Sequence, residues 1–174
     1  HRDLHSFPTR RSSDLYPEFK LDDVVPAENV YHYRNKMEFT FSPNRWLLSD
    51  EQEDTSKSVA LGLHIPGRFD KILNIKECHI QPEIGNRILN KTQEICEAHT
   101  ELVPYNPKTH TGFLRHLMLR FGIRTQQLMV NIVTAYEDMD KLSPLVDGLL
   151  NDISEITSMV NNVNTRKADS AFGE

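Results

Sequence analysis

The spacing of apolar residues alternates between two periods along the chain, and this constrains the fold more than any other feature. A period of two residues, typical of half-buried β-strands, occurs over 59–65, 71–75, 113–121, 126–134 and 156–163. A spacing of three or four residues, typical of amphipathic helices, occurs over 82–99 and 139–153. From about residue 71 the order matches a ferredoxin-like βαββαβ unit. We therefore expect an α+β fold, a mostly antiparallel sheet with two amphipathic helices on one face.

A further strand is predicted over Tyr31–Phe41, ahead of this unit. One face of that strand should point into the core, and it comprises Tyr33, Asn35, Met37, Phe39 and Phe41. The other face is polar and charged, and it comprises Arg34, Lys36, Glu38 and Thr40. The pattern predicts a strand with one buried face and one charged outer face.

Composition excludes several classes of protein. The 174 residues include 20 Lys and Arg against 25 Asp and Glu, so bulk charge does not indicate a strongly basic nucleic-acid binder. No apolar run approaches the length of about 18 residues that a membrane span requires, so we expect no membrane partner. Two cysteines, Cys78 and Cys96, exclude a disulfide framework and favour a reducing, cytoplasmic compartment.

Residues 1–15 have neither period. The stretch His5–Leu15 matches, codon by codon, the translation of a widely used short-read sequencing adapter; the alternative is a disordered basic tail. We therefore expect 1–15 to be a disordered artefact, 16–30 a linker and 31–174 one domain. Without residues 1–15, 17 basic and 23 acidic residues remain, a net charge of −6. The missing start methionine and the abrupt end at Glu174 predict an internal fragment.

No local signature of catalysis is visible in the residues themselves. No Gly-rich phosphate loop follows a predicted strand. His32, His64 and His79 lack the partner four residues away that makes a metal pair on a helix. We therefore assign no catalytic residue to this chain.

Three stretches carry a family resemblance. They are Tyr31–Phe41 (YHYRNKMEFTF), Gly62–Ile75 with its continuation Glu77–Gln81 (GLHIPGRFDKILNI and ECHIQ), and Gly112–Arg120 (GFLRHLMLR). In order and spacing they resemble the central domain of the RNA uracil-C5-methyltransferases, most closely the bacterial 23S rRNA (uracil-5-)-methyltransferases. The resemblance covers Tyr31 to about Glu174.

The resemblance implies methyl transfer from S-adenosylmethionine to C5 of a uridine in 23S rRNA, by a cytoplasmic monomer that does not act on DNA. In that family a cysteine thiolate adds to C6, because C5 of uracil is a poor nucleophile until C6 is attacked, and a carboxylate then removes the C5 proton. These groups and the donor site belong to a C-terminal Rossmann-like domain, and an OB-type RNA-binding domain often precedes the central one. We expect both domains to be missing, and the chain alone to be inactive.

The resemblance also implies a role for Cys78. Many members bind a [4Fe-4S] cluster through three cysteines in a C-x5-C-x2-C run and a fourth in a motif like Glu77–Ile80. Cys78 matches that fourth ligand, and the other three would lie upstream of Tyr16. The alternative is that Cys78 is a small buried hydrophobe at a strand end. Cys96 lies on the apolar helix face and is expected to pack in the core.

RNA contacts are predicted at Arg34, Lys36 and Arg68, while Arg115 and Arg120 fall on opposite faces of their strand. The alternative is an ordinary solvated surface beside Glu38. The net charge predicts that this domain would not bind RNA alone. Two other functions remain open: a tRNA uracil-C5-methyltransferase, and a non-catalytic ferredoxin-like binding module.

Overall fold

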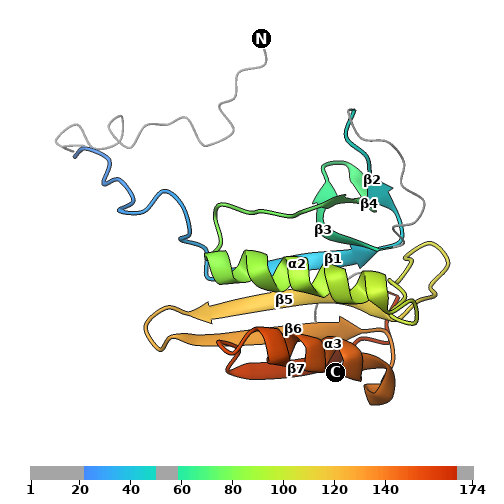
Figure 1. The fold of residues 1–174 in the computed structure, drawn as a ribbon. Coiled ribbons are helices and arrows are strands. Elements are labelled where there is room, and N and C mark those ends of the chain that lie inside the picture. The colour runs from blue at the N-terminus through green and yellow to red at the C-terminus, as the bar shows by residue number, and fades with distance from the viewer. Residues whose placement is uncertain (1–21, 50–58, 168–174) are drawn as a thin grey trace, which may run out of the picture.

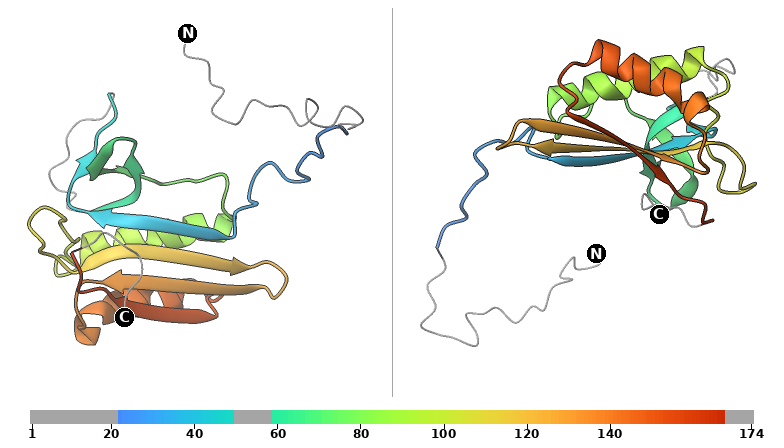
Figure 2. Two further views of the ribbon diagram at one scale, coloured as in Figure 1. Left: turned by 180° about the vertical axis from the view of Figure 1, so that it is seen from behind. Right: turned by 90° about the horizontal axis from the view of Figure 1, so that it is seen from below.

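One seven-stranded sheet carries both helices on a single face (Figures 1 and 2). The structure, a computed structural model, describes residues 22–49 and 59–167. The elements in chain order are β1 (Lys36–Ser42), β2 (Arg45–Trp46), β3 (Ala60–Ile65), β4 (Arg68–Asn74), α2 (Glu83–Ala98), β5 (Leu114–Gly122), β6 (Gln127–Thr134), α3 (Met139–Asp152) and β7 (Ser158–Val163). Residues 1–15 and the start of the predicted linker lie outside the described residues, and residues 22–30 are exposed without helix or strand.

The sheet is mixed, which corrects the expectation of a mostly antiparallel one. Its strands lie in the order β2-β4-β3-β1-β5-β6-β7. Four neighbouring pairs are antiparallel, whereas β2 lies parallel to β4 and β7 lies parallel to β6. The two-residue β2 was not predicted, because so short a segment has no recognisable period.

The ferredoxin-like arrangement is not confirmed, although the predicted chain order of strands and helices from β4 onward is present. In a split βαβ unit, a helix connects two parallel strands with another strand between them. Here β4 and β5 are separated by β3 and β1, and the three antiparallel pairings between them make β4 antiparallel to β5. The second helix connects β6 and β7, which are direct neighbours.

The two helices form where the spacing predicts them, within one or two residues. The apolar stripe of α2 buries Ile88, Leu89, Ile95 and Cys96 against the sheet. The stripe of α3 buries Leu142, Leu145 and Leu149. Asp138 caps the start of α3, because its carboxylate accepts a hydrogen bond from the Lys141 backbone N–H. No helix in the described ranges is long and apolar enough to cross a membrane.

The core is centred on β1 and β5. Phe39 lies directly opposite Leu117, and both side chains are fully buried. Met37 and Phe41 are also buried, as the alternation predicts. The prediction is wrong for Tyr33, which is 61% exposed, and for Asn35, which is also exposed. The strand begins only at Lys36, because the backbone of residues 32–34 bonds to His79 and Ile80 instead of a sheet strand.

The face of β5 that points away from the helices is also partly buried, which its alternation did not predict. Met118 and Val133 form a small second cluster there. Arg115 is only 2% exposed, and its guanidinium donates hydrogen bonds to the carbonyls of Asn164 and Arg166. The same guanidinium lies 4.2 Å from the centre of the Tyr105 ring. Arg115 therefore holds the chain that follows β7 and is not an exposed basic residue.

Substituting Phe39→Ala should lower the free energy of unfolding by about 3–5 kcal/mol, because it removes a large side chain from a packed core. The control is Tyr33→Ala, which alters a residue predicted on the same face but found exposed, and it should change the free energy by less than about 1 kcal/mol. Urea unfolding followed by circular dichroism measures both. Equal losses in the two variants would contradict the observed start of β1.

Candidate functional site

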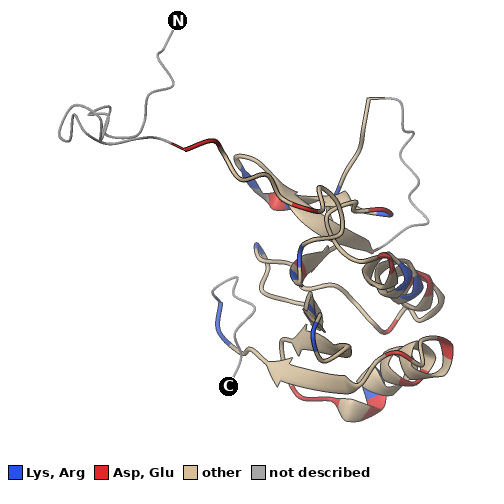
Figure 3. Cartoon of the chain, turned by 90° about the vertical axis from the view of Figure 1, so that its left-hand side faces the viewer, with Lys and Arg blue, Asp and Glu red and all other residues tan. Residues whose placement is uncertain are grey.

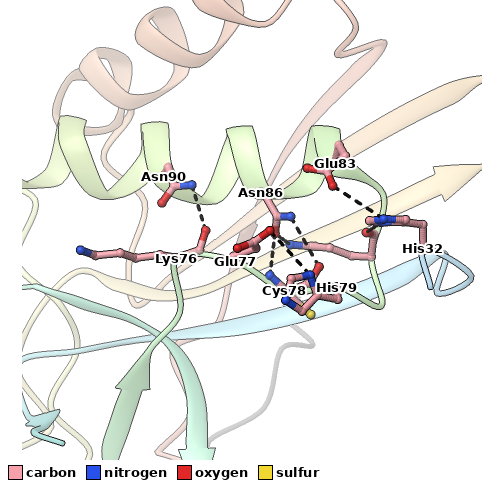
Figure 4. Close-up of polar contacts among 9 residues, drawn as sticks. His32, Lys76, Glu77, Cys78, His79, Glu83, Asn86 and Asn90 are labelled. Atoms are coloured by element: carbon pink, nitrogen blue, oxygen red, sulfur yellow. Dashed lines mark hydrogen bonds and ion pairs between the residues drawn. The ribbon is translucent and has the colours of Figure 1, made fainter. Parts of the chain in front are cut away.

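The segment before β1 and the loop between β4 and α2 are joined in a junction that contains Cys78 (Figure 4). The backbone N–H of His32 donates to the His79 carbonyl at 2.9 Å, and that of Arg34 donates to the Ile80 carbonyl at 2.8 Å. The His32 ring Nδ1 lies 2.7 Å from the Gln81 carbonyl oxygen. His32 adopts a left-handed backbone with φ of 57°, a conformation uncommon for a side-chain-bearing residue. Two stretches that are far apart in sequence therefore meet here.

Helix α2 holds this loop through Asn86 and Asn90. The buried Asn86 Oδ1 accepts from the Cys78 backbone N–H at 2.9 Å and from Gln81 Nε2 at 2.7 Å. One turn later, Asn90 Nδ2 donates to the Lys76 carbonyl at 2.9 Å. Sequence reasoning missed both residues. The available signal was their spacing of four residues, which puts two amides on the same side of the predicted helix.

The two cysteines differ in environment. Cys78 lies half-buried in the loop, next to the exposed Glu77 and His79. Cys96 is buried in the core, as predicted, and burial raises the pKa of its thiol to about 12. The Cys96 thiol is therefore protonated at neutral pH.

A [4Fe-4S] cluster does not fit the residues of this chain alone. Such clusters need four thiolates, and the sequence contains two cysteines, one of them in the core. Within residues 22–49 and 59–167, no group of three or more His, Cys, Asp or Glu side chains is placed to hold a metal ion. A cluster at Cys78 would require three thiolates from outside this sequence.

Arg34 and Lys36, predicted as RNA contacts, lie next to each other at the start of β1. Arg34 Nε donates to the Lys36 carbonyl at 3.0 Å, and Lys36 Nζ lies 3.9 Å from a Glu38 carboxylate oxygen. Lys36 is paired with Arg120 across the β1–β5 ladder, so their side chains share one face of the sheet. Arg120 is exposed and therefore adds a third basic group here.

Arg68, the third predicted contact, lies at the β3–β4 turn. It borders an open hollow of ≈ 610 Å³, which Glu38, Thr40 and His64 also line. Thr40 Oγ1 lies 3.3 Å from His64 Nε2 and 3.3 Å from His116 Nδ1. These three residues, which all line the hollow, are therefore linked by hydrogen bonds. The structure thus brings Arg34 and Lys36 together at the start of β1. Arg68 lies apart from them, at the β3–β4 turn beside the hollow.

Asp70 joins two cations at this turn. Its carboxylate accepts from Arg68 Nε at 3.2 Å and from Lys108 Nζ at 2.7 Å. The hydrogen bond from Lys108, followed by that from Arg68, lowers the pKa of Asp70 to about 2. Arg68 is therefore partly neutralised, which weakens it as a phosphate contact relative to Arg34.

Comparison with known proteins identifies relatives. No family model matches the chain. An uncharacterized RNA methyltransferase of Chlorobaculum tepidum is 41% identical over 164 residues, covering 90% of this chain and 34% of the relative. Others from Bacteroides thetaiotaomicron and Porphyromonas gingivalis are 35% and 33% identical, each over 86% of this chain and 34% of the relative. Over its matched residues the chain is therefore homologous to part of proteins named as RNA methyltransferases. It spans about a third of the length of these relatives.

A solved structure shares the fold of this RNA methyltransferase homologue. It is the tRNA (uracil-54, C5)-methyltransferase of Pyrococcus abyssi in complex with S-adenosyl-L-homocysteine. The TM-score is 0.62 at 24% identity, over 86% of this chain and 32% of that one. This likeness shows a shared fold, and the curated relatives support the predicted resemblance at the coarser level of an RNA methyltransferase.

The two thiols should react differently with a water-soluble thiol reagent. At neutral pH one thiol per folded chain should react rapidly and the second only after unfolding, because Cys96 is buried with a raised pKa. Counting modified thiols by mass spectrometry measures this. Cys78→Ser should remove the rapid reaction and Cys96→Ser should preserve it; rapid modification of both thiols in the folded chain would contradict the assignment.

The lowered pKa of Asp70 predicts a pH effect on stability. A carboxylate with a depressed pKa in the folded state stabilises that state fully above its ordinary pKa of 3.8, and this contribution is lost as the pH falls towards about 2. Asp70→Asn should therefore lower stability at neutral pH and flatten its dependence on pH across that window. Urea unfolding at several pH values measures both effects. In the Asp70→Asn background, Lys108→Met should lower the free energy of unfolding little further. If the losses of the two single variants instead add in full, the ion pair does not contribute to stability.

Proposed function

We propose that this chain is the RNA-binding central part of an S-adenosylmethionine-dependent RNA uracil-C5-methyltransferase. The proposal is carried by where the family motifs lie. The Y-R-N-K-x-E-F motif leads into β1, and the G-x-H-x-P-G-x-F-D motif forms β3, its turn and the start of β4. These strands are neighbours in one sheet, so the two motifs make one continuous region of the molecule.

The role of this chain in the reaction is to bind and orient RNA, and on its own it does not transfer methyl groups. S-adenosylmethionine supplies the methyl group in the longer protein. Methylation at C5 needs a thiolate to attack C6. Cys96 does not suit that task, because its thiol is buried and has a pKa of about 12. We therefore assign neither the attack on uracil C6 nor the binding of S-adenosylmethionine to the described residues.

RNA is expected on the sheet side of the molecule, opposite the helices. Helices α2 and α3 together carry six acidic and three basic residues, so their layer repels phosphate. Figure 3 shows both acidic and basic segments on the helices, and further basic segments on the strands and loops of the sheet. Arg34, Lys36 and Arg68 are the proposed phosphate contacts, and Arg120 joins them through its pairing with Lys36.

The proposed substrate is a uridine of 23S rRNA, modified by a cytoplasmic monomer. This choice rests on the closer resemblance of the three motifs to the rRNA enzymes. A tRNA substrate is the second candidate, and the observation that favours it is the shared fold with the Pyrococcus abyssi tRNA enzyme.

Cys78 is proposed as the fourth [4Fe-4S] ligand only in a longer protein that supplies three more cysteines. Two features of the junction support this: the thiol is half-buried, and Asn86 holds the Cys78 backbone. The 174-residue chain should retain no iron after anaerobic reconstitution with iron and sulfide. Iron bound by the wild-type chain and lost in Cys78→Ser would show that this chain holds a metal with ligands not recognised above.

A chimera tests the proposed activity. Residues 31–167 would replace the matching segment of the Chlorobaculum tepidum relative, which is 41% identical. Incubation with labelled S-adenosylmethionine and either 23S rRNA or tRNA, followed by nuclease digestion and mass spectrometry, should detect 5-methyluridine in the rRNA. A chimera that folds and binds S-adenosylhomocysteine but methylates neither RNA at uracil C5 would refute the proposal. Methylation of tRNA alone would select the second candidate.

Arg34→Ala should weaken RNA binding by the chimera for all sequences alike, because Arg34 is proposed to contact phosphate. The slope of log affinity against log salt should fall by about 1. Arg87→Ala is the control, since Arg87 lies on α2 and pairs with Glu155 at 2.6 Å. Fluorescence anisotropy across a salt series measures both. Unchanged affinity in Arg34→Ala would remove Arg34 from the RNA-binding surface.

A further inference from the structure

An apolar hollow of ≈ 260 Å³ opens between the start of α2 and the β5–β6 turn. Its apolar lining includes Pro82, Ile84, Phe121 and Leu128. Ile123 stands at its edge and is 63% exposed. This hollow belongs to neither the Cys78 junction nor the hollow beside Arg68.

The edge of the hollow is polar. Gln126 and Gln127 are exposed and line it together with Glu155, whose carboxylate is occupied by Arg87 at 2.6 Å. A glutamine amide offers two donors and an acceptor, which match the hydrogen-bonding edge of a nucleobase. Gln126 has a φ of 54°, so the turn that carries these amides adopts a specific left-handed backbone.

Basic groups surround this end of the sheet. The Phe121 backbone N–H donates to the Asn35 carbonyl at 2.8 Å, which places the Arg34–Lys36 segment beside the wall of the hollow. Arg120 precedes Phe121 directly, and Arg124 is exposed within the turn. Arg120 and Phe121 point to opposite faces of the sheet, so an RNA whose phosphates lie on Lys36 and Arg120 would pass round the β5–β6 turn, past Arg124, to reach the hollow.

We propose that this hollow binds one unstacked base of a single-stranded RNA whose phosphates lie on Arg34, Lys36, Arg120 and Arg124. The proposal rests on the RNA-binding role proposed above and adds a base-binding site to it. A nucleobase has an apolar face and a polar edge, and the hollow offers an apolar wall with Phe121 and an amide-bearing edge. The basic groups Arg34, Lys36, Arg120 and Arg124 favour a polyanion such as RNA over a second copy of the chain, and Glu155, the acidic residue that lines the hollow, is paired with Arg87.

The test is a titration of the 15N-labelled 174-residue chain with a short oligouridylate, followed by NMR. Low ionic strength is used because phosphate contacts weaken steeply with salt, and NMR detects the weak binding expected of an acidic chain. The amide signals of Ile84 and of residues 121–128 should shift together with those of residues 34–36. An abasic oligonucleotide of the same length should shift residues 34–36 but leave the hollow unchanged.

Ile123→Asp should weaken binding of oligouridylate by about tenfold, the usual order for loss of one base contact. The matched control is Leu150→Asp, because Leu150 is also an exposed aliphatic residue, 45% exposed, and lies on α3. Wild-type affinity in Ile123→Asp, with weaker binding in Arg34→Ala, would refute the base site and leave RNA binding intact. Absence of any shift in the wild-type chain would refute the base site as well, whereas the chimera assay judges methyl transfer separately. A concentration-dependent dimer that Ile123→Asp dissociates, with RNA binding unchanged, would assign the hollow to a second copy.

Discussion

The antiparallel pairing of β1 with β5 holds the described part of the molecule together. Among the described strands, it is the pairing that joins β2, β4, β3 and β1 on one side to β5, β6 and β7 on the other. Five consecutive residue pairs form this ladder, and both side chains of the pair Phe39 and Leu117 are fully buried. The family motifs fall on both sides of the pairing, so each proposed RNA contact depends on it for its position. A loss of packing at Phe39 would therefore affect function as well as stability.

Much of the fold was predictable from residue spacing, and the errors have specific physical causes. The helices and all six predicted strands follow from local periodicity, which is set by one element and its buried face. The partners of each strand are set by long-range contacts, which periodicity does not encode. The order of strands therefore differs from the expected ferredoxin-like one. Tyr33 illustrates a second cause of error: its alternation continues that of β1, but backbone hydrogen bonds to His79 and Ile80 draw residues 32–34 away from the sheet.

The candidate site was predictable only where a motif identifies it. Arg34, Lys36, Arg68 and Cys78 were found through the family resemblance, and the burial of Cys96 through its place on an apolar helix face. Asn86 was missed because its role is to bond a backbone eight residues away, and an asparagine on a helix is no distinctive signal. The apolar hollow was also missed. Ile84, Phe121 and Leu128 come from three different elements, and only the folded arrangement brings them to one opening.

Arg115 has a mechanical consequence. Its guanidinium bonds to the carbonyls of Asn164 and Arg166, just beyond edge strand β7. Tension applied to the chain after β7 therefore reaches β5, in the middle of the sheet, before it can peel the edge strand from β6. A force directed at this edge strand is thus transferred to β5, which is hydrogen-bonded to strands on both sides.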